Sequence, residues 1–500
     1  MEPLNPDALP RLPADVARPR YGRDALRAGI VHLGVGAFHR AHIAVVNEAA
    51  LHAGGDLHWG TVGVSLRAAD TRDALQPQGG LYTLALRDAA EDGTAREALQ
   101  VVGNLLEVLV APEDPQAVLE RIAHADTRIV SLTITEKGYH HDPATGALRL
   151  DAADIAHDLA HPETPRTMPG FVVHALALRR ARGLAPVTVM SCDNLPANGD
   201  TTRGIVLAFA RQVDAGLRDW IEAHCTFPNS MVDRIVPRTT DGDRERIAAR
   251  LGIEDAWPVI GEPFLEWVVE DRFANGRPDW TAGGARFVAH AQPYEKLKLR
   301  MVNGAHSALA YLGAMAGLRT VDRAMAEPAL RSYIDALMRE EIAPTLPAMP
   351  GLDLDSYRAR LLQRFSNSAL HHQTKQIAMD GSQKLPQRLL GTLRDRLAAG
   401  LPIDRLALAV AAWMHYLRGT DETGATHDIQ DPLAPALAER LAQAGAASGM
   451  QDRVAFFTGF APVFGELGKE PRFVAAVARH LSMLETQGVR AALAATTAPA

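Results

Sequence analysis

The run Ile30–His42, which reads IVHLGVGAFHRAH, decides the fold. An apolar stretch leads directly into Gly34 and Gly36, and a segment compatible with a helix follows. In a dinucleotide-binding turn the first glycine permits the tight bend, and the second lets the backbone approach a pyrophosphate at a helix N-terminus. The third glycine of that fingerprint is absent, because His39 occupies its position. The run therefore favours a Rossmann-type turn, although a G-x-G pair alone is a weak signal.

The first half of the chain alternates short apolar runs with longer helical stretches. The runs are nearly continuous in apolar residues, as expected for strands buried on both faces of a parallel sheet. The expected strands are Ile30–Gly34, Thr61–Leu66, Arg128–Thr135 and Pro186–Cys192, and the expected covering helices include Thr167–Arg182 and Thr201–Glu222. We therefore predict an α/β fold with a mostly parallel sheet in a Rossmann-type N-terminal domain.

After about Gln292 the sequence becomes a succession of Ala/Leu-rich amphipathic segments, and apolar β-type runs become scarce. The expected helices are Leu297–Met315, Pro328–Glu341, Leu352–Phe365, Leu385–Ala399, Ile403–Leu417 and Pro471–Glu485. We predict that residues 1–290 form the dinucleotide-binding domain, with a Pro-rich arm at 1–28. Residues 291–500 then form an all-helical substrate and catalytic domain, which ends in a frayed tail at 491–500.

Composition and charge exclude several classes of protein. The formal net charge of −7 and the scattered Lys and Arg residues argue against a nucleic-acid partner. Cys192 and Cys225 are the only cysteines, which excludes a disulfide framework and fits the reducing cytoplasm. The N-terminal segment carries charges and prolines where a signal peptide would be apolar, and no uncharged stretch reaches membrane-spanning length. We expect a cytoplasmic protein with no membrane partner.

The end of the second expected strand bears on the choice of nicotinamide cofactor. A carboxylate at Asp70 would accept hydrogen bonds from the ribose hydroxyls and repel a 2′-phosphate, which favours NAD. Arg67 would instead hold that phosphate, which favours NADP. A helix-capping Asp beside a solvent-facing Arg is an equally good structural interpretation. These residues alone leave the choice open.

The stretch Tyr294–Tyr311, YEKLKLRMVNGAHSALAY, carries the strongest signal for chemistry. Lys298, Asn303 and His306 offer a proton acceptor, an amide donor and an imidazole within nine positions. On an α-helix, at about 100° per residue, Asn303 lies roughly 140° and His306 roughly 80° round from Lys298, so the three share one broad face. The alternative is a surface lysine, an Asn-Gly pair that disturbs the helix, and a histidine satisfied in the core. Spacing alone favours that alternative.

The first domain also contains two polar clusters. Ser191–Gly199, SCDNLPANG, lies after an expected strand, where open α/β sheets bind ligands, and Asn194 is its best candidate. Asn and Asp are also ordinary turn formers, which is the stronger interpretation for Asn198-Gly199. The cluster Phe227–Arg234, FPNSMVDR, offers Asp233 as a contact, with an internal Asp–Arg pair as the equal alternative.

Two other chemistries are rejected. Tyr294 and Lys298 form Y-x-x-x-K, the catalytic pair of short-chain dehydrogenases, but that family's glycine pattern is absent and its pair lies far earlier in a chain. The paired histidines at 140–141 and 371–372 lack the spacing of a known metal site. We expect no metal.

Together these segments resemble the polyol-specific long-chain dehydrogenases, the mannitol dehydrogenase family. The matching pieces span roughly residues 30–390 in order. They are GVGAFHRAH, SLTITEKGY, SCDNLPANG, FPNSMVDRIVP, EPFLEWVVEDRFANGRPDW, the K-x4-N-x2-H run from Lys298 to His306, and RFSNSAL with DGSQKLP. The resemblance implies a Rossmann-type N-terminal domain, a helical C-terminal domain, and a metal-free, NAD-dependent reaction in the cleft between them.

The resemblance also implies a role for each matching residue. Lys298 would be the general base, Asn194 and Asn303 the clamp on the substrate oxygen, His306 the residue that orients the substrate, and Glu295 part of the proton relay. Asp233 and Lys384 would line the sugar site. The implied cofactor contacts are Gly34, Gly36, Phe38, Arg40 and Asp70, and Asp70 matches the acidic position associated with NAD.

Within the family, the segment Gln373–Leu390 looks closer to fructuronate reductases (D-mannonate oxidoreductases) than to mannitol 2-dehydrogenases. Gln376 stands where mannitol enzymes usually have an arginine that contacts the polyol, and Lys137 stands where some have glycine. A uronate carries a carboxylate, so cations such as Lys384 or Arg388 would have a use. We expect a sugar-acid substrate, D-mannonate/D-fructuronate, with D-mannitol/D-fructose as the alternative.

The sequence also allows a non-enzyme alternative, an NAD-binding regulatory protein. The intact Lys298, Asn303 and His306 argue against it. The assembly is expected to be a monomer or a small homo-oligomer whose partner is a small-molecule sugar acid or polyol.

Overall fold

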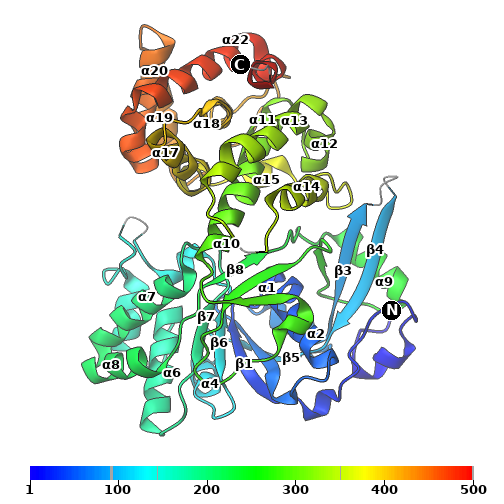
Figure 1. The fold of residues 1–500 in the computed structure, drawn as a ribbon. Helices are drawn as coiled ribbons and strands as arrows, with labels where there is room; N and C mark the ends of the chain where they lie inside the picture. The colour runs from blue at the N-terminus through cyan, green and yellow to red at the C-terminus, as the bar shows by residue number, and fades with distance from the viewer. Residues whose placement is uncertain (90–93, 143–144, 350, 498–500) are drawn as a thin grey trace. The chain divides into compact units, whose positions relative to one another are not determined.

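The computed structural model describes residues 1–89, 94–142, 145–349 and 351–497. The chain folds into two compact units, and the division falls within helix α10 (Gln292–Leu297), because the first unit runs to Glu295 and the second begins at Lys296. In Figure 1 the first unit runs from blue to green and the second from green to red.

A five-stranded parallel sheet forms the centre of the first unit (Figure 1). Its order is β5 (Leu105–Val110), β2 (Gly60–Ser65), β1 (Ala28–Leu33), β6 (Ile129–Leu132) and β7 (Thr188–Ser191), with every neighbouring pair parallel. Counted along the chain, the sheet's strands stand in the order third, second, first, fourth, fifth, which is the Rossmann order. The prediction of a Rossmann-type parallel sheet is confirmed, and the four expected strands are β1, β2, β6 and β7.

Both faces of this sheet are buried, which explains why β1, β2, β6 and β7 are nearly continuous in apolar residues. In β1, Val31 and Leu33 belong to a core cluster shared with helices α4 (Pro115–Ile122), α6 (Met168–Ala181) and α7 (Asn198–Val213). Ile30 points to the other face, into a cluster with α2 (Ile43–His52) and the strand β10 (Glu266–Glu270). Alternate residues of one strand therefore fill two separate cores.

Two three-stranded sheets complete the first unit, and the sequence did not predict them. One has the order β11 (Ala285–Val288), β10, β8 (Ser230–Asp233), and the other has the order β4 (Ala95–Val102), β3 (Tyr82–Ala89), β9 (Val259–Gly261). Each combines a parallel and an antiparallel pair. The N-terminal arm packs on the second sheet, because Leu4 and Leu12 are buried with Leu99 and with Ile247 of α9 (Asp241–Leu251).

The remaining α-helices of the first unit are α1 (Ala37–Ala41), α3 (Asp70–Leu75), α5 (Ala153–Ala160) and α8 (Ala215–His224). The expected single helix Thr201–Glu222 is in fact two, because α7 ends at Val213. Asp214 is extended there, with φ −163°, and its carboxylate accepts the N–H of Leu217 at 2.5 Å to start α8.

In the part of the second unit that the structure describes, the regular elements are helices and no strand forms, as predicted. Its α-helices are α11 (Ala305–Met315), α12 (Val321–Ala326), α13 (Pro328–Ala336), α14 (Leu354–Phe365), α15 (Thr374–Ala378), α16 (Gly381–Leu385), α17 (Gly391–Ala398), α18 (Asp404–Tyr416), α19 (Ala434–Ala444), α20 (Met450–Thr458), α21 (Ala461–Phe464) and α22 (Pro471–Thr497). Three π-helical turns interrupt them: η6 (Lys298–Gly304), η7 (Leu337–Ile342) and η9 (Pro386–Leu390).

Helices α11 and α18 pack together at the centre of this unit, and α18 also packs against α22. All residues of α11 are buried, and so are residues 406–416 of α18. The prediction of a frayed tail was wrong for residues 491–496, because α22 continues beyond a kink at Gly488 and Leu493 is 1% exposed. Residues 498–500 lie outside the described part of the chain.

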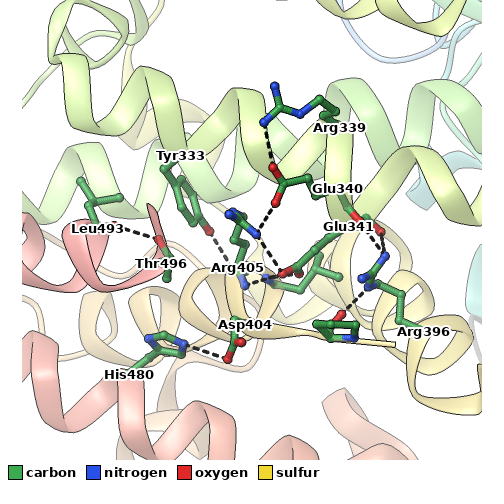
Figure 2. Close-up of polar contacts among 12 residues, drawn as sticks. Tyr333, Arg339, Glu340, Glu341, Arg396, Asp404, Arg405, His480, Leu493 and Thr496 are labelled. Atoms are coloured by element: carbon green, nitrogen blue, oxygen red, sulfur yellow. Dashed lines mark hydrogen bonds and ion pairs between the residues drawn. The ribbon is translucent and has the colours of Figure 1, made fainter. Parts of the chain in front are cut away.

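A buried residue, Glu341, joins three of these elements through its carboxylate and its backbone carbonyl oxygen (Figure 2). Glu341 of η7 accepts the N–H groups of Arg405 and Leu406, at 2.8 and 2.9 Å, at the start of α18. The Arg396 guanidinium of α17 donates to the Glu341 carbonyl oxygen at 3.0 Å. Burial raises the pKa of Glu341, while these donors and the arginines oppose the increase. The network fixes the π-helical turn η7 to the core helix.

Candidate functional site

Gly34 makes the turn at the end of β1. Its backbone has φ +93°, which side-chain-bearing residues rarely adopt, and a β-carbon there would lie 2.1 Å from the carbonyl oxygen of Thr133. The next glycine, Gly36, stands at the N-terminus of α1. A β-carbon on Gly36 would have one neighbour within 4 Å, the Gly34 oxygen at 3.9 Å. The first glycine therefore makes the turn, and the second leaves open space beside the backbone.

A cleft of about 920 Å³ opens at this turn. It is lined by Gly34–Gly36 after β1, by Ser65–Ala68 after β2 and by Thr133–Thr135 after β6. Strands β1 and β6 are the neighbours at which the strand order of the sheet reverses. Open α/β sheets bind their ligands in the crevice at that switch point. The position of the cleft and its open glycine backbone fit a dinucleotide.

Phe38 and Arg40 are not among the residues that line this cleft in the described part of the chain. The Phe38 ring stacks on His42, with centroids 5.0 Å apart. Arg40 is 5% exposed, donates to the carbonyl oxygen of Trp257, and lies 5.3 Å from the ring centroid of Tyr82. Burial lowers the pKa of Arg40 to about 10. Both side chains pack inside the unit, and their assignment as cofactor contacts stays a prediction.

Of the two residues that bear on cofactor choice, Arg67 lines the cleft. Asp70 is the exposed first residue of α3 and adjoins Thr71, which also lines the cleft. Both side chains that bear on the choice between NAD and NADP, the Arg67 guanidinium and the Asp70 carboxylate, therefore lie in or next to the cleft.

The loop after β7 carries Asp193 and Asn194. Asn194 is exposed, whereas Asp193 is buried. The Asp193 carboxylate accepts the N–H groups of Ile134 and Thr135, both at 2.9 Å, and the Tyr139 hydroxyl at 2.7 Å. Burial raises the pKa of Asp193 to about 6, and these three donors limit the increase.

Asn198 has a structural role in the same loop. Its side-chain amide donates to the carbonyl oxygens of Asp193 and Ser230, at 3.0 and 2.9 Å, and its oxygen accepts the Ser230 N–H at 2.9 Å. The Asn229 oxygen accepts the Gly199 N–H at 2.9 Å. The clusters SCDNLPANG and FPNSMVDR are therefore bonded to each other, and the turn-forming interpretation of Asn198-Gly199 fits these contacts.

Glu295 lies at the same loop as Asn194. Its two carboxylate oxygens lie 3.2 and 3.1 Å from the Ala197 nitrogen, which donates to them. Asp233 is the buried last residue of β8, opposite Glu266 of β10 in the antiparallel register. The first unit thus groups Glu295 with Asn194 and places Asp233 at a strand end.

The stretch that carries the predicted base is a π-helical turn, η6. In such a turn each N–H donates to the carbonyl oxygen five residues earlier. The angle between Lys298 and Asn303 round the axis is therefore smaller than the roughly 140° expected for an α-helix. Lys298 is half-buried, and Asn303 is 8% exposed with no hydrogen-bond partner for its Nδ2 in the described structure. A β-carbon on Gly304 would lie 2.8 Å from the carbonyl oxygen of Arg388, so η6 packs closely on η9.

His306 follows one turn later, in α11. Its ring stacks on Phe365, with centroids 4.0 Å apart, and meets the His372 ring edge-on at 5.9 Å. Burial holds the pKa of His306 well below its ordinary value, and the charges of His372 when protonated, of Arg364 and of Arg388 lower it further. The imidazole is therefore neutral near pH 7. Its buried Nε2 has no hydrogen-bond partner among the described residues.

Cationic side chains lie near this histidine and near His372, the histidine beside it. Arg388 of η9 donates to the Ser307 hydroxyl at 3.2 Å, and Lys384 of α16 donates to the carbonyl oxygen of Ile377 at 3.3 Å. The charge of Lys384 also contributes to the lowered pKa of His372, which is about 4 chiefly because of burial. Gln376 is exposed on α15. A carboxylate near His306 would meet positive potential.

Each unit therefore gathers part of the predicted set. The first holds Gly34 and Gly36 at the cleft and Asn194 with Glu295 at one loop. The second holds Lys298, Asn303 and His306 on consecutive turns, and Lys384 near His372, which meets His306 edge-on. Sequence reasoning missed Asp193, Thr135 and Tyr139, although it quoted the motifs that contain them, because the signal is a hydrogen-bond network between distant segments.

Among the residues that the structure describes, no group of three or more His, Cys, Asp or Glu side chains is arranged to hold a metal ion. In the same described segments, no helix is both long and apolar enough to cross a membrane. Cys192 and Cys225 are buried free thiols.

A Rossmann sheet with its ligand cleft at the switch point, followed by a helical unit that carries a Lys, Asn and His cluster, defines a class of two-unit oxidoreductases. Within that class, the chain belongs to the mannitol dehydrogenase family. Residues 28–282 match the mannitol dehydrogenase Rossmann domain, and residues 290–485 match the mannitol dehydrogenase C-terminal domain.

Several relatives of known name are similar over nearly the whole chain. A D-mannonate oxidoreductase of Escherichia coli (strain K12) is 44% identical over 96% of this chain and 98% of its own length. A mannitol 2-dehydrogenase of Phaeosphaeria nodorum is 41% identical over 98% of this chain and 85% of that protein. A solved Pseudomonas fluorescens mannitol 2-dehydrogenase, in ternary complex with NAD and D-mannitol, matches with a TM-score of 0.89 and 41% identity over 99% of both chains.

Proposed function

We propose that this protein is an NAD-dependent oxidoreductase that interconverts D-mannonate and D-fructuronate. The observation that carries the proposal is the position of Arg388, whose guanidinium donates to the Ser307 hydroxyl at 3.2 Å, next to the neutral His306. A sugar acid differs from a polyol by a carboxylate, which such a charge would bind. The relationship to a D-mannonate oxidoreductase supports the same choice.

The cofactor assignment rests on the cleft of the first unit. The open backbone at Gly36 and the position of the cleft at the switch point fit the pyrophosphate of a dinucleotide. A related structure was solved with NAD. NAD, when bound, supplies the hydride-accepting nicotinamide. Asp70 is assigned to the ribose hydroxyls on the strength of the resemblance.

In the proposed reaction the substrate hydroxyl gives its proton to the Lys298 amine. A lysine can serve as a base near neutral pH when desolvation and neighbouring positive charge favour its uncharged form. Asn303 and Asn194 would donate hydrogen bonds to the oxygen on which negative charge develops. The buried Asn303 amide nitrogen has no partner among the described residues, as such a donor requires.

The remaining candidates have supporting roles in this proposal. His306, held neutral by burial, would hydrogen-bond and orient the substrate through Nε2. Glu295 would relay the proton, Asp233 and Lys384 would bind sugar hydroxyls, and Gln376 would border the sugar site.

The charge on Arg388 offers a direct test of the carboxylate assignment. Arg388→Met keeps the apolar stem and removes the charge, so kcat/KM for D-fructuronate should fall by about 10- to 100-fold, the worth of a charge-assisted hydrogen bond. Its kcat/KM for D-fructose should change by less than about threefold, since that sugar has no carboxylate to lose a contact. Steady-state NADH oxidation with each sugar measures both.

Arg394→Met is the matched control, because it removes the same charge from an exposed position on α17. It should leave both values unchanged. Equal losses for the two sugars in Arg388→Met would contradict the carboxylate role.

The second candidate function is that of a mannitol 2-dehydrogenase. It is favoured by the similarity to the mannitol 2-dehydrogenases of Pseudomonas fluorescens and Phaeosphaeria nodorum. It requires the same Lys298, Asn303 and His306, so a comparison of kcat/KM for D-fructuronate and D-fructose separates the two functions.

A further inference from the structure

The buried carboxylate of Asp193 joins two loops of the first unit. Asp193 lies on the loop after β7, whereas its three donors, Ile134, Thr135 and Tyr139, all follow β6. Both carboxylate oxygens are used: Oδ1 accepts from Thr135, and Oδ2 accepts from Ile134 and from the Tyr139 hydroxyl. One side chain therefore determines how these two strand-end segments lie against each other.

The segment that Asp193 holds has a strained backbone. Thr135 has φ +64° and ψ +164°, a conformation nearly confined to glycine. Such a conformation persists in a residue with a β-carbon only where the surroundings over-determine it. The N–H of Thr135 and that of its neighbour Ile134 both end on Asp193, so the carboxylate is the contact that opposes relaxation of this backbone.

The strained segment is also a wall of the cofactor cleft. Thr133, Ile134 and Thr135 all line it, together with Gly34 on the facing turn. The Thr133 hydroxyl donates to the Gly34 carbonyl oxygen at 2.7 Å and contacts His32 Nε2 at 2.8 Å. The wall is thus fixed to the glycine turn at one end and to Asp193 at the other.

We propose that Asp193 is a positioning residue, which holds Thr133–Thr135 in its cleft-lining conformation and thereby sets the affinity for the dinucleotide. The inference rests on the proposed function, because it takes a nicotinamide dinucleotide as the ligand of the cleft. Asp193 acts through the Thr135 backbone, and Asn194 beside it is left to the substrate.

The ionisation of Asp193 agrees with this role. Burial raises its pKa to about 6, so the group is mainly a carboxylate at pH 7.5 and accepts all three bonds. The Tyr139 hydroxyl, whose pKa burial raises above its ordinary value, stays protonated and acts as a donor. A neutral amide at this position would present an N–H group to donors that need an acceptor.

Asp193→Asn tests the proposal through the dissociation constant of NADH, measured on the full chain at pH 7.5 by fluorescence titration. The amide oxygen replaces one acceptor only, so at least one donor is left unpaired and the wall relaxes. The dissociation constant should rise by about 10- to 100-fold. The KM for NADH should rise with it, while kcat at saturating NADH should fall by less than about fivefold.

Asp255→Asn is the matched control. Asp255 is also a buried carboxylate, which accepts the N–H groups of Thr83 and Trp257 and the amide of Gln78, but it does not line the cleft. It should lower the melting temperature without changing the NADH dissociation constant by more than about threefold. Similar losses of NADH affinity in both variants would overturn the proposal, because they would report general destabilisation.

Two more variants keep the test decisive. Adding Thr135→Gly to Asp193→Asn makes the wall conformation unstrained and should recover at least about fivefold of the lost affinity. Tyr139→Phe removes one donor from Asp193 without a change of shape, and should raise the dissociation constant by about 3- to 10-fold even if Asp193→Asn fails to fold. No recovery in the first, or unchanged binding in the second, overturns the proposal.

The binding assay also separates this inference from the proposed function. A wild-type protein that binds NADH but reduces neither sugar would refute the reaction and leave the role of Asp193 open to measurement. A wild-type protein that does not bind NADH would refute the cofactor and, with it, this inference.

Discussion

Lys298→Ala is expected to lower kcat by about 10³-fold or more at every pH between about 6 and 10, because removal of the general base leaves the substrate proton with no acceptor of comparable strength. The dissociation constant of NADH should stay within about twofold of the wild-type value, since Lys298 belongs to the helical unit and the cleft is built from the first. Initial rates across pH, together with NADH titration of the same preparations, give both quantities.

Lys296→Ala is the control for this change. Lys296 lies two residues earlier and pairs with Asp395 at 3.3 Å, so its loss removes a partly exposed ion pair, while Arg300 of η6 keeps its own pair with Asp395 at 2.7 Å. It should retain activity within about threefold. Turnover close to that of the wild type in Lys298→Ala would contradict the assignment of the base.

Gly34→Ala is expected to abolish detectable NADH binding, with a dissociation constant raised by more than about 100-fold, and to destabilise the first unit by about 3 kcal/mol or more. The added β-carbon would lie 2.1 Å from the Thr133 oxygen, and the backbone φ of +93° would itself be strained. Either the turn or the strand-end segment at Thr133 must move, and both line the cleft. Chemical denaturation and fluorescence titration measure the two effects.

Substitutions at two other glycines separate the effect of backbone strain from the effect of a side chain in the cleft. Gly252→Ala places a β-carbon at φ +75° with nothing within 4 Å, so it should cost only about 1 kcal/mol and leave NADH binding intact. Gly36→Val points into open space, so it should leave the fold stable within about 1 kcal/mol yet weaken NADH binding by about 10-fold or more. Normal NADH binding in Gly34→Ala would contradict the assignment of the turn.

Most of the main sheet was predictable from the sequence because both of its faces are buried. Ile30 packs in one core and Val31 in the other, so the run is nearly continuously apolar and indicates a central parallel strand. Strand β5 was missed because Glu107 interrupts its run. In the two small sheets, β9 has only three residues, and the eight-residue strands β3 and β4 carry charged residues such as Arg87 and Glu97, so neither sheet shows a set of continuous apolar runs.

The composition of the helical unit was predictable, but the geometry of its key turn was not. The K-x4-N-x2-H run was predicted to form an α-helix, in which Asn303 lies roughly 140° round the axis from Lys298 on one broad face. The π-helical turn depends on tertiary packing, since Gly304 lies against the Arg388 carbonyl some eighty residues away in the sequence. No local pattern reports such a contact.

The role of Asp193 was hidden for the same physical reason. A carboxylate in SCDNLPANG reads as a turn former, and only its burial and its bonds to Thr135 and Tyr139 distinguish it. The positive φ of Thr135 is likewise invisible in the sequence, because threonine is an unfavourable choice for that conformation.

The proposed interconversion of D-mannonate and D-fructuronate is tested most directly by kinetics. The measurement compares kcat/KM for the NADH-dependent reduction of D-fructuronate with kcat/KM for that of D-fructose, and repeats both with NADPH. We expect D-fructuronate to be preferred by about 10²-fold or more, because its carboxylate can form charge-assisted hydrogen bonds that D-fructose, which has no carboxylate, cannot form. NADH should be preferred over NADPH. A preference for D-fructose by orders of magnitude, or no oxidation of NADH by either sugar, would contradict the account.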